Sequence, residues 1–211
     1  CVTRRQRQMC IRDRHYSLAA GIADSAIGEA AIALGKENIA DGQAAFSAGR
    51  GSRVTADYGV AIGYSNHATA SYALSLGHDS YAGGNASIAI GEFAGAIQDN
   101  TAAIGSYVSA KAEDNMVIGN GFDGTNRIEN AIANSLMVGF GSDTATLFVG
   151  PSAGPGTWGQ IGIGTVQPRA QLSLGELDAG SAGPQNGPQL LLSGKFNEGA
   201  NRGDGGVAHK L

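Results

Sequence analysis

The chain has 211 residues, a formal net charge of −4, 42% apolar residues, only 6% aromatic residues and 34 glycines. Small side chains and frequent turns on this scale do not build the core of a large enzyme. No Ser-His-Asp or paired-carboxylate pattern rises above background, so we expect no catalytic site and no cofactor. No apolar run reaches the roughly 18 residues of a membrane span, so any membrane anchor is expected outside this sequence.

Residues 1–14 differ from everything that follows. They hold both cysteines and five of the fourteen basic residues, and they share no period with the rest of the chain. They resemble translated sequencing-adapter read-through, and we interpret them as a non-native leader; the alternative is a basic arm for nucleic acid or another anionic surface. Without them nine basic residues (14 minus 5) face 17 acidic residues (18 minus 1). The resulting net charge of −8 argues against a nucleic-acid partner.

From residue 15 to about residue 150 the chain repeats with a period of fourteen. Fourteen residues are too few for a helix pair or a propeller blade, and they suit one coil of a β-solenoid with two short strands and two tight turns. We therefore predict an all-β fold of stacked coils. A glycine is expected at the turn after each strand, where a positive φ is favoured. These repeat glycines are Gly35, Gly49, Gly63, Gly77, Gly91, Gly105 and Gly119.

Large and small residues occupy separate columns of the repeat. Counted from each glycine, positions eleven and thirteen are mostly large and apolar, as in Val60 and Ile62, whereas position twelve is small, as in Ala61. This alternation predicts a strand with one buried face, so we expect the large columns to point into the coil and the small column to point outward. Position five, from Ala40 to Ala110, is also small and is expected to line the interior from the second, shorter strand.

The predicted coil has a thin core. Burial gains about 25 cal/mol per Å² of apolar surface, against roughly 1 kcal/mol or more of entropy lost per ordered residue. A single solenoid of this width would be marginal, and association of chains into a homotrimer along the axis would supply the missing core. The alternative is a monomeric solenoid with capped ends.

The regular spacing is interrupted after Gly119. Most repeat glycines close a small apolar tetrad, such as Val60-Ala61-Ile62-Gly63. The next tetrad glycine, Gly139, follows after twenty residues, so the six extra residues around 121–126 are expected to form a surface loop. Another tetrad ends at Gly150, and we expect the stack to end near it. A glycine-rich β transition element is expected over residues 151–175. Residues 176–211 are expected to be a linker and the start of a truncated module, in which the integrin-type tripeptide Arg202-Gly203-Asp204 is interpreted as accidental.

Two repeat units carry a family resemblance. Asn85-Ala86-Ser87-Ile88-Ala89-Ile90-Gly91 and Asn100-Thr101-Ala102-Ala103-Ile104-Gly105 resemble the Asn-Ser-Val-Ala-Ile-Gly unit of the YadA-like head of trimeric autotransporter adhesins. The resemblance spans about residues 19–150 and implies a left-handed parallel β-roll, three chains side by side, and adhesion to host matrix or cell surfaces. Residues 161–174 are instead similar to the Gly-Ile-Gly-Thr-x-x-Pro-x-x-x-Leu element of phage tail-fibre and bacterial surface-fibre proteins, which often precedes an intramolecular chaperone.

Two functions of different classes remain open. The first is a non-enzymatic adhesin head, exposed at the bacterial outer membrane, that binds host extracellular-matrix protein, cell-surface protein or glycan through many weak copies. Its candidate ligand-facing residues are Asn85, Ser87, Asn100 and Thr101. The second is the structural shaft of a virion tail fibre. Ice binding ranks last because the outward columns lack a threonine ladder. No metal site is expected, since His67 and His78 occupy different columns.

Overall fold

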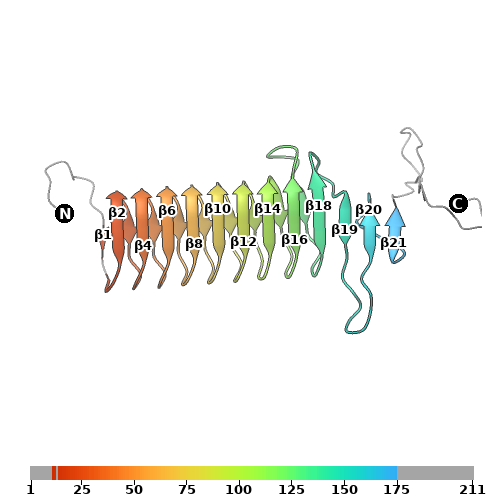
Figure 1. Ribbon diagram of the computed structural model, residues 1–211, viewed down its shortest axis with the longest axis horizontal. Helices are drawn as coiled ribbons and strands as arrows, with labels where there is room; N and C mark the ends of the chain where they lie inside the picture. The colour runs from red at the N-terminus through yellow and green to blue at the C-terminus, as the bar shows by residue number, and fades with distance from the viewer. Residues whose placement is uncertain (1–10, 13, 175–211) are drawn as a thin grey trace, which may run out of the picture.

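The computed structural model describes residues 11, 12 and 14–174 of the chain. This part is all-β and forms a β-solenoid, a rod of similar coils stacked along one axis (Figure 1). A typical coil has one long strand of five residues and one short strand of two or three residues, joined by two tight turns. The predicted fold class and the fourteen-residue coil are therefore confirmed.

The long strands stack in one sheet and the short strands in another. The long strands are β2 (Leu18–Ile22), β4 (Ile32–Lys36), β6 (Phe46–Arg50), β8 (Val60–Tyr64), β10 (Leu74–His78), β12 (Ile88–Glu92), β14 (Ala102–Ser106), β16 (Met116–Asn120) and β18 (Leu136–Phe140). The short strands are β1 (Ile11–Arg12), β3 (Ser25–Ala26), β5 (Ile39–Ala40), β7 (Arg53–Val54), β9 (His67–Ala68), β11 (Tyr81–Ala82), β13 (Gly95–Ala96), β15 (Val108–Ala110) and β17 (Ile128–Asn130). All of these pairs are parallel and in register, so Leu74 of one coil lies opposite Ile88 of the next.

The repeat glycines form one column through the stack, at the fourth position of each long strand and not in the turn beyond it. Gly63 and Gly77 have φ of 126° and 118°, a region that side-chain-bearing residues rarely adopt. A Cβ on Gly63 would also collide with the carbonyl oxygen of Gly77 in the next coil. The predicted positive φ is confirmed, and the close approach of successive coils gives a second reason for glycine.

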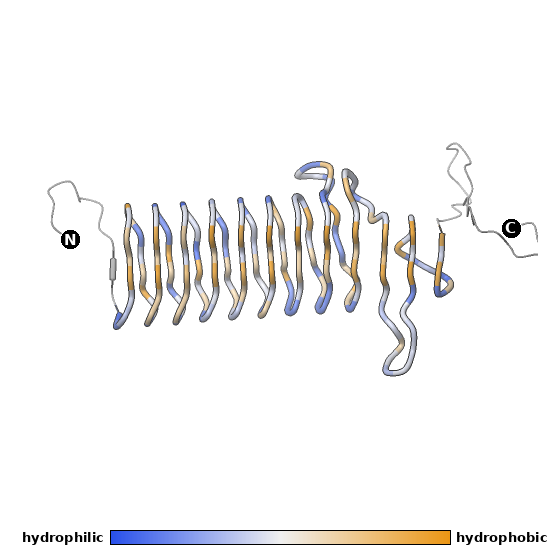
Figure 2. Tube along the Cα trace, in the orientation of Figure 1, coloured by the Kyte–Doolittle hydropathy of each residue, from blue (hydrophilic) through white to orange (hydrophobic). Residues whose placement is uncertain are grey.

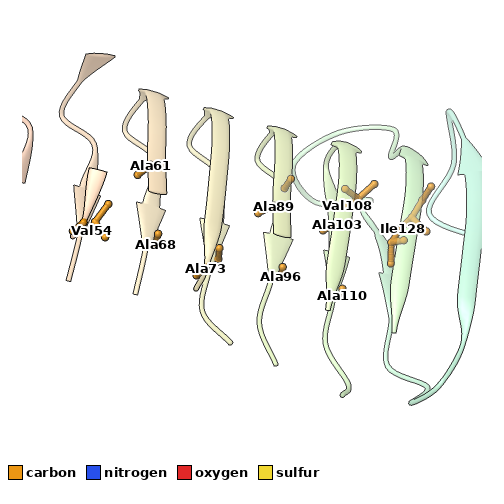
Figure 3. Packing of buried hydrophobic residues seen from close by; sticks show 14 of the residues in the cluster. Val54, Ala61, Ala68, Ala73, Ala89, Ala96, Ala103, Val108, Ala110 and Ile128 are labelled. Atoms are coloured by element: carbon orange, nitrogen blue, oxygen red, sulfur yellow. The ribbon is translucent and has the colours of Figure 1, made fainter. Parts of the chain in front are cut away.

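The interior of the coil overturns the predicted strand phase. The second residue of every long strand from β4 to β18 is buried, including Ala61 and Ala89, whereas the neighbours Ile62 and Ile90 face outward. The small residues of the short strands are buried as predicted, from Ala40 to Ala110. Figure 3 shows these buried side chains recurring from coil to coil along the rod. The small columns of the two sheets therefore pack against each other, and the large columns lie outside.

The physical reason is the width of the coil. A closed turn of fourteen residues brings its two strands so close that alanine, serine and valine fill the space between them. A leucine or isoleucine at every inward position would overpack such a core. Alternation shows that a strand has two unlike faces, but it does not say which of them is the inside.

The parallel stack ends at Phe140. The insertion forms a loop over residues 121–127, between β16 and β17, as predicted. The tetrad that ends at Gly150 is not a further coil. Its strand, β19 (Leu147–Val149), folds back antiparallel to β18, because the eleven-residue spacing is too short for a coil. Next, β20 (Ile161–Ile163) pairs antiparallel to β19, and β21 (Leu172–Leu174) pairs parallel to β20.

Several sequence predictions concern residues outside this description. Most of the predicted leader (1–10 and residue 13), the module predicted over 176–211 and the tripeptide Arg202-Gly203-Asp204 lie beyond the described residues. Within the described part, Ile11–Arg12 pairs with Ser25–Ala26 at the start of the short-strand sheet. No helix in that part is long and apolar enough to cross a membrane.

Candidate functional site

The long-strand sheet presents an apolar surface to the outside. We define the outer apolar face as the first and third residues of every long strand and of β19, β20 and β21. Pairing in register places all of them on one side of the sheet. Every one of these residues is apolar. Figure 2 shows the resulting hydrophobic bands in strand after strand along the rod.

The outer apolar face is open to solvent in the single chain. Ile62 is 40% exposed in the middle of the rod and Leu172 is 55% exposed near its C-terminal end. Twelve strands at a spacing of about 4.8 Å make the face roughly 50 Å long. A soluble monomer rarely exposes a continuous apolar patch of that extent, so the face is a candidate interaction surface.

The first corner, which we define as the last residue of each long strand together with the turn after it, holds a ladder of rings. Tyr64, His78, Phe93 and Tyr107 come from four successive coils, and adjacent ring centroids lie 5.2 to 5.4 Å apart. Arg50 covers the N-terminal end of the ladder, with its guanidinium 5.6 Å from the Tyr64 centroid. Only Phe93 and Tyr107 are stacked face to face, at 14°, whereas the two contacts of His78 are tilted by 57° and 55°. These ring–ring contacts stabilise the corner.

The second corner, which we define as the turn after each short strand, holds a shorter aromatic stack. Tyr58 and Tyr72 occupy the same turn position in adjacent coils, with centroids 5.2 Å apart and ring planes 7° from parallel. Both residues have a positive φ, as do Ala44 and Ala86 at the same position in the flanking coils. The Tyr72 side chain is 65% exposed, so the stack stands out from the rod.

Amide and carboxylate groups continue the second corner beyond this stack. The Asn85 side chain donates to both carboxylate oxygens of Asp99, at 3.1 and 3.2 Å. One coil further, Asn100 donates to Asp114 at 3.0 Å. These four side chains are exposed, so their remaining oxygens are accessible to a ligand.

The four predicted ligand-facing residues separate into two pairs. Asn85 and Asn100 are exposed on the second corner. Ser87 and Thr101 are buried, and the Thr101 hydroxyl donates to the carbonyl of Gln98 at 2.6 Å. The prediction that all four point outward is therefore wrong for Ser87 and Thr101. They lie at the first inward position after the turn, where only small side chains fit.

Tyr58 and Tyr72 are not among the residues predicted from the sequence. Their signal is a column: the ninth position after the glycine is small or polar in most coils and tyrosine in these two adjacent ones. Residues at that position share a turn conformation with positive φ, so their side chains leave the rod in the same direction. Comparing this column from coil to coil would have found the pair.

Other sites that the fold offers are less specific. In the described part of the chain, no group of three His, Cys, Asp or Glu side chains is placed to hold a metal ion. An open hollow of about 700 Å³ lies beside the 150–159 loop and is lined largely by glycine, proline and small residues. On the 121–127 loop, hydrogen bonds from the backbone of Asn126 and Thr125 and from the Asn126 side chain lower the pKa of Asp123.

Comparisons with protein-family models, with curated proteins and with solved structures find no match for the chain.

Proposed function

We propose that the chain belongs to a non-enzymatic, trimeric fibre of the bacterial cell surface that adheres to host matrix or cell-surface protein or glycan. The observation that carries the proposal is the outer apolar face. A protein that keeps alanine inside and isoleucine outside has placed its main hydrophobic surface where only another chain can bury it.

Copies of the same chain are the partner that fits this face best. The face repeats every coil, and a second copy laid parallel to the first matches that repeat along its whole length. Three chains around a common axis close the assembly and leave no apolar edge, because the two columns of each face can meet two neighbours. The resemblance to the head of trimeric autotransporter adhesins favours the same arrangement.

Adhesion follows from what such a trimer leaves outside. The short-strand sheet and both corners stay at the surface, and similar groups recur there from coil to coil. Many weak and equivalent contacts to a matrix protein or glycan add through avidity, so no deep pocket is needed. The expected location is the bacterial outer surface.

Light scattering on the full chain tests the assembly. We expect a trimer that Ile62→Asp breaks into monomers, because a charge would be buried between chains. Arg53→Asp is the matched control, since Arg53 is exposed on the short-strand sheet and should leave the trimer intact. A monomeric parent chain, or a dimer, would contradict the trimeric proposal.

Shortening the rod tests the adhesive function. Deleting residues 22–49 removes two periods and keeps the register of the remaining coils. Binding of the full-chain and shortened trimers to collagen, laminin and cultured cells should then weaken with the loss of repeats. If the shortened trimer binds as well as the full-chain trimer and binding requires only residues 151–211, the coils are a structural shaft, as in the tail-fibre alternative.

A further inference from the structure

The Tyr58–Tyr72 stack has an open end. Tyr58 covers one face of Tyr72. The other face points along the axis toward the next coil, which is held directly against this one by the Ala86 N–H donating to the Ser71 carbonyl at 3.0 Å. At the turn position where a third ring would continue the stack, about 4.8 Å further on, the chain has only the methyl group of Ala86.

Polar groups lie on the two coils that follow this open ring face. Asn85 lies next to Ala86 in the chain, and its amide contacts the Asp99 carboxylate. Asn100, one coil beyond, donates to Asn85 through its backbone N–H at 2.9 Å. An exposed aromatic face with amide and carboxylate oxygens beside it has the chemistry that recognises a sugar ring. The ring face packs on the carbon–hydrogen face of the sugar, and the oxygens accept its hydroxyl protons.

The charge of the second corner selects among sugars. Its charged residues are mostly acidic: Glu29, Asp41, Asp57, Asp99, Glu113 and Asp114. Its cations are Arg14, near the N-terminal end of the rod, and Lys111, which forms an ion pair with Glu129 at 2.6 Å. The cations Lys36, Arg50 and Arg53 lie at or next to the first corner. Sialylated or sulfated glycans would be repelled at the second corner, and a neutral sugar that offers hydroxyl donors would not.

We infer that the second corner carries one subsite per chain for a neutral hexopyranose ring, with Tyr72 as its stacking platform and Asn85, Asp99 and Asn100 as its hydrogen-bonding groups. The inference rests on the proposed adhesive function and adds a ligand class and a position to it. A trimer would present three such subsites around the rod, in addition to the repeated shallow contacts.

The test uses the full chain on an array of neutral hexose and N-acetylhexosamine oligosaccharides, with sialylated and sulfated glycans on the same array. Tyr72→Ala removes the platform, and Ala86→Tyr covers its open face with a third ring. Both changes suit the backbone, because tyrosine and alanine already adopt the same turn conformation at this position, with φ between 51° and 61°. Tyr64→Ala is the control, since Tyr64 is also an exposed tyrosine, at 45%, but lies at the first corner.

We expect neutral glycans to be retained, and Tyr72→Ala and Ala86→Tyr each to weaken their binding about tenfold or more. Tyr64→Ala should leave binding unchanged, and Tyr72→Phe should keep it. Ala86→Tyr should melt no lower than the parent chain, which separates occlusion from unfolding. The subsite would be overturned if the parent chain retained only acidic glycans, or no glycan. It would also be overturned if the parent chain, Tyr72→Ala and Ala86→Tyr bound neutral glycans equally. If the chain binds cells but retains no glycan, the proposed adhesive function stands and only the sugar subsite is refuted.

Discussion

The N-terminal and C-terminal coils of this solenoid follow the same backbone path but bury different side chains at one position of the repeat. From Asp24 to Ser80 the third residue after each glycine is polar and buried, forming a polar ladder whose other members are Asn38, Ser52 and Asn66. In the later coils the position holds Ala94 and Val108, and beyond the inserted loop Ile128 pairs with Val108 and takes the equivalent place; all three are buried. Val108 and Ile128 are among the largest fully buried side chains in the described part of the chain.

The polar ladder connects neighbouring coils through directional bonds. The Asn66 amide donates to the carbonyls of Ile62 in its own coil, at 2.8 Å, and of Gly77 in the next coil, at 2.6 Å. Its oxygen accepts from the Ser80 backbone N–H at 3.0 Å. A slip of register would leave these buried groups unpaired, whereas Val108 and Ile128 would still bury apolar area. We therefore infer that the polar half specifies the alignment of coils and that the apolar half contributes packing.

The largest expected effect tests a feature that both halves share, the small inward column of the long strands. Ala61→Asp in the N-terminal half and Ala89→Asp in the C-terminal half should each lower the free energy of unfolding by about 3–5 kcal/mol, because each buries an unpaired charge. The exposed control Thr55→Asp should cost less than about 0.5 kcal/mol. Urea unfolding measures the three values, and an inward variant as mild as Thr55→Asp would contradict the corrected strand phase.

The next prediction sets the two halves against each other. Asn66→Ala leaves the partners of the three hydrogen bonds of this buried side chain unpaired and should cost about 3–4 kcal/mol. Val108→Ala loses two methyl groups' worth of packing and should cost about 2 kcal/mol. Amide exchange at Ser80 separates the mechanisms, because only Asn66→Ala frees that N–H. Equal exchange in the two variants would remove the distinction between the halves.

A smaller and opposite effect is expected where the polar ladder begins. The first carboxylate oxygen of Asp24 accepts from the Asn38 backbone and side chain, at 2.9 and 3.0 Å. Its second oxygen is buried without a hydrogen-bond partner, at the place where the later asparagines present a donor to the glycine carbonyl. Asp24→Asn would turn this oxygen into a donor and should raise stability by about 1 kcal/mol.

Thermal unfolding measures that gain, and Asp99→Asn is the control, an exposed carboxylate of the second corner. A loss of stability in Asp24→Asn would mean that the second oxygen of Asp24 is not placed like the amide nitrogens of Asn38 and Asn66.

The stacked-coil architecture could be predicted from the sequence because the glycine period is a direct consequence of stacking. Gly63 and its equivalents must let the next backbone approach, so they recur without exception in the regular coils. The direction of Ile62 and Ala61 was beyond that reasoning, since alternation is symmetric and the deciding quantity is the width of the coil. The small residues at position five were the missed clue, because a column of alanines on one strand requires small partners on the other.

The site was harder to predict for a related reason. Asn85 and Asn100 belong to the repeated unit and were visible as a motif, but Ser87 and Thr101 belong to the same motif and lie inside. Tyr58 and Tyr72 become a pair only when residues fourteen apart are placed side by side, and their open end depends on an alanine, a residue with no functional signature of its own.

The smallest expected effect concerns the loop that interrupts the apolar half. The Asp123 carboxylate accepts from the backbone N–H groups of Thr125 and Asn126, each at 2.8 Å, and these bonds to its ionised form lower its pKa from the ordinary value of 3.8. A lowered pKa means that the ionised carboxylate stabilises the folded loop above pH 3.8 and that this contribution disappears as the pH falls through the lowered value.

We expect the Asp123 carboxyl signal in nuclear magnetic resonance to titrate below 3.8. The Thr125 amide should exchange faster over the same interval, and Asp123→Asn should abolish that dependence. Protection of the Asn66 and Val108 amides should not change with it, because the exposed loop is attached to the coils and does not hold them together. A carboxyl that titrates at or above its ordinary value would show that these backbone bonds do not persist in solution.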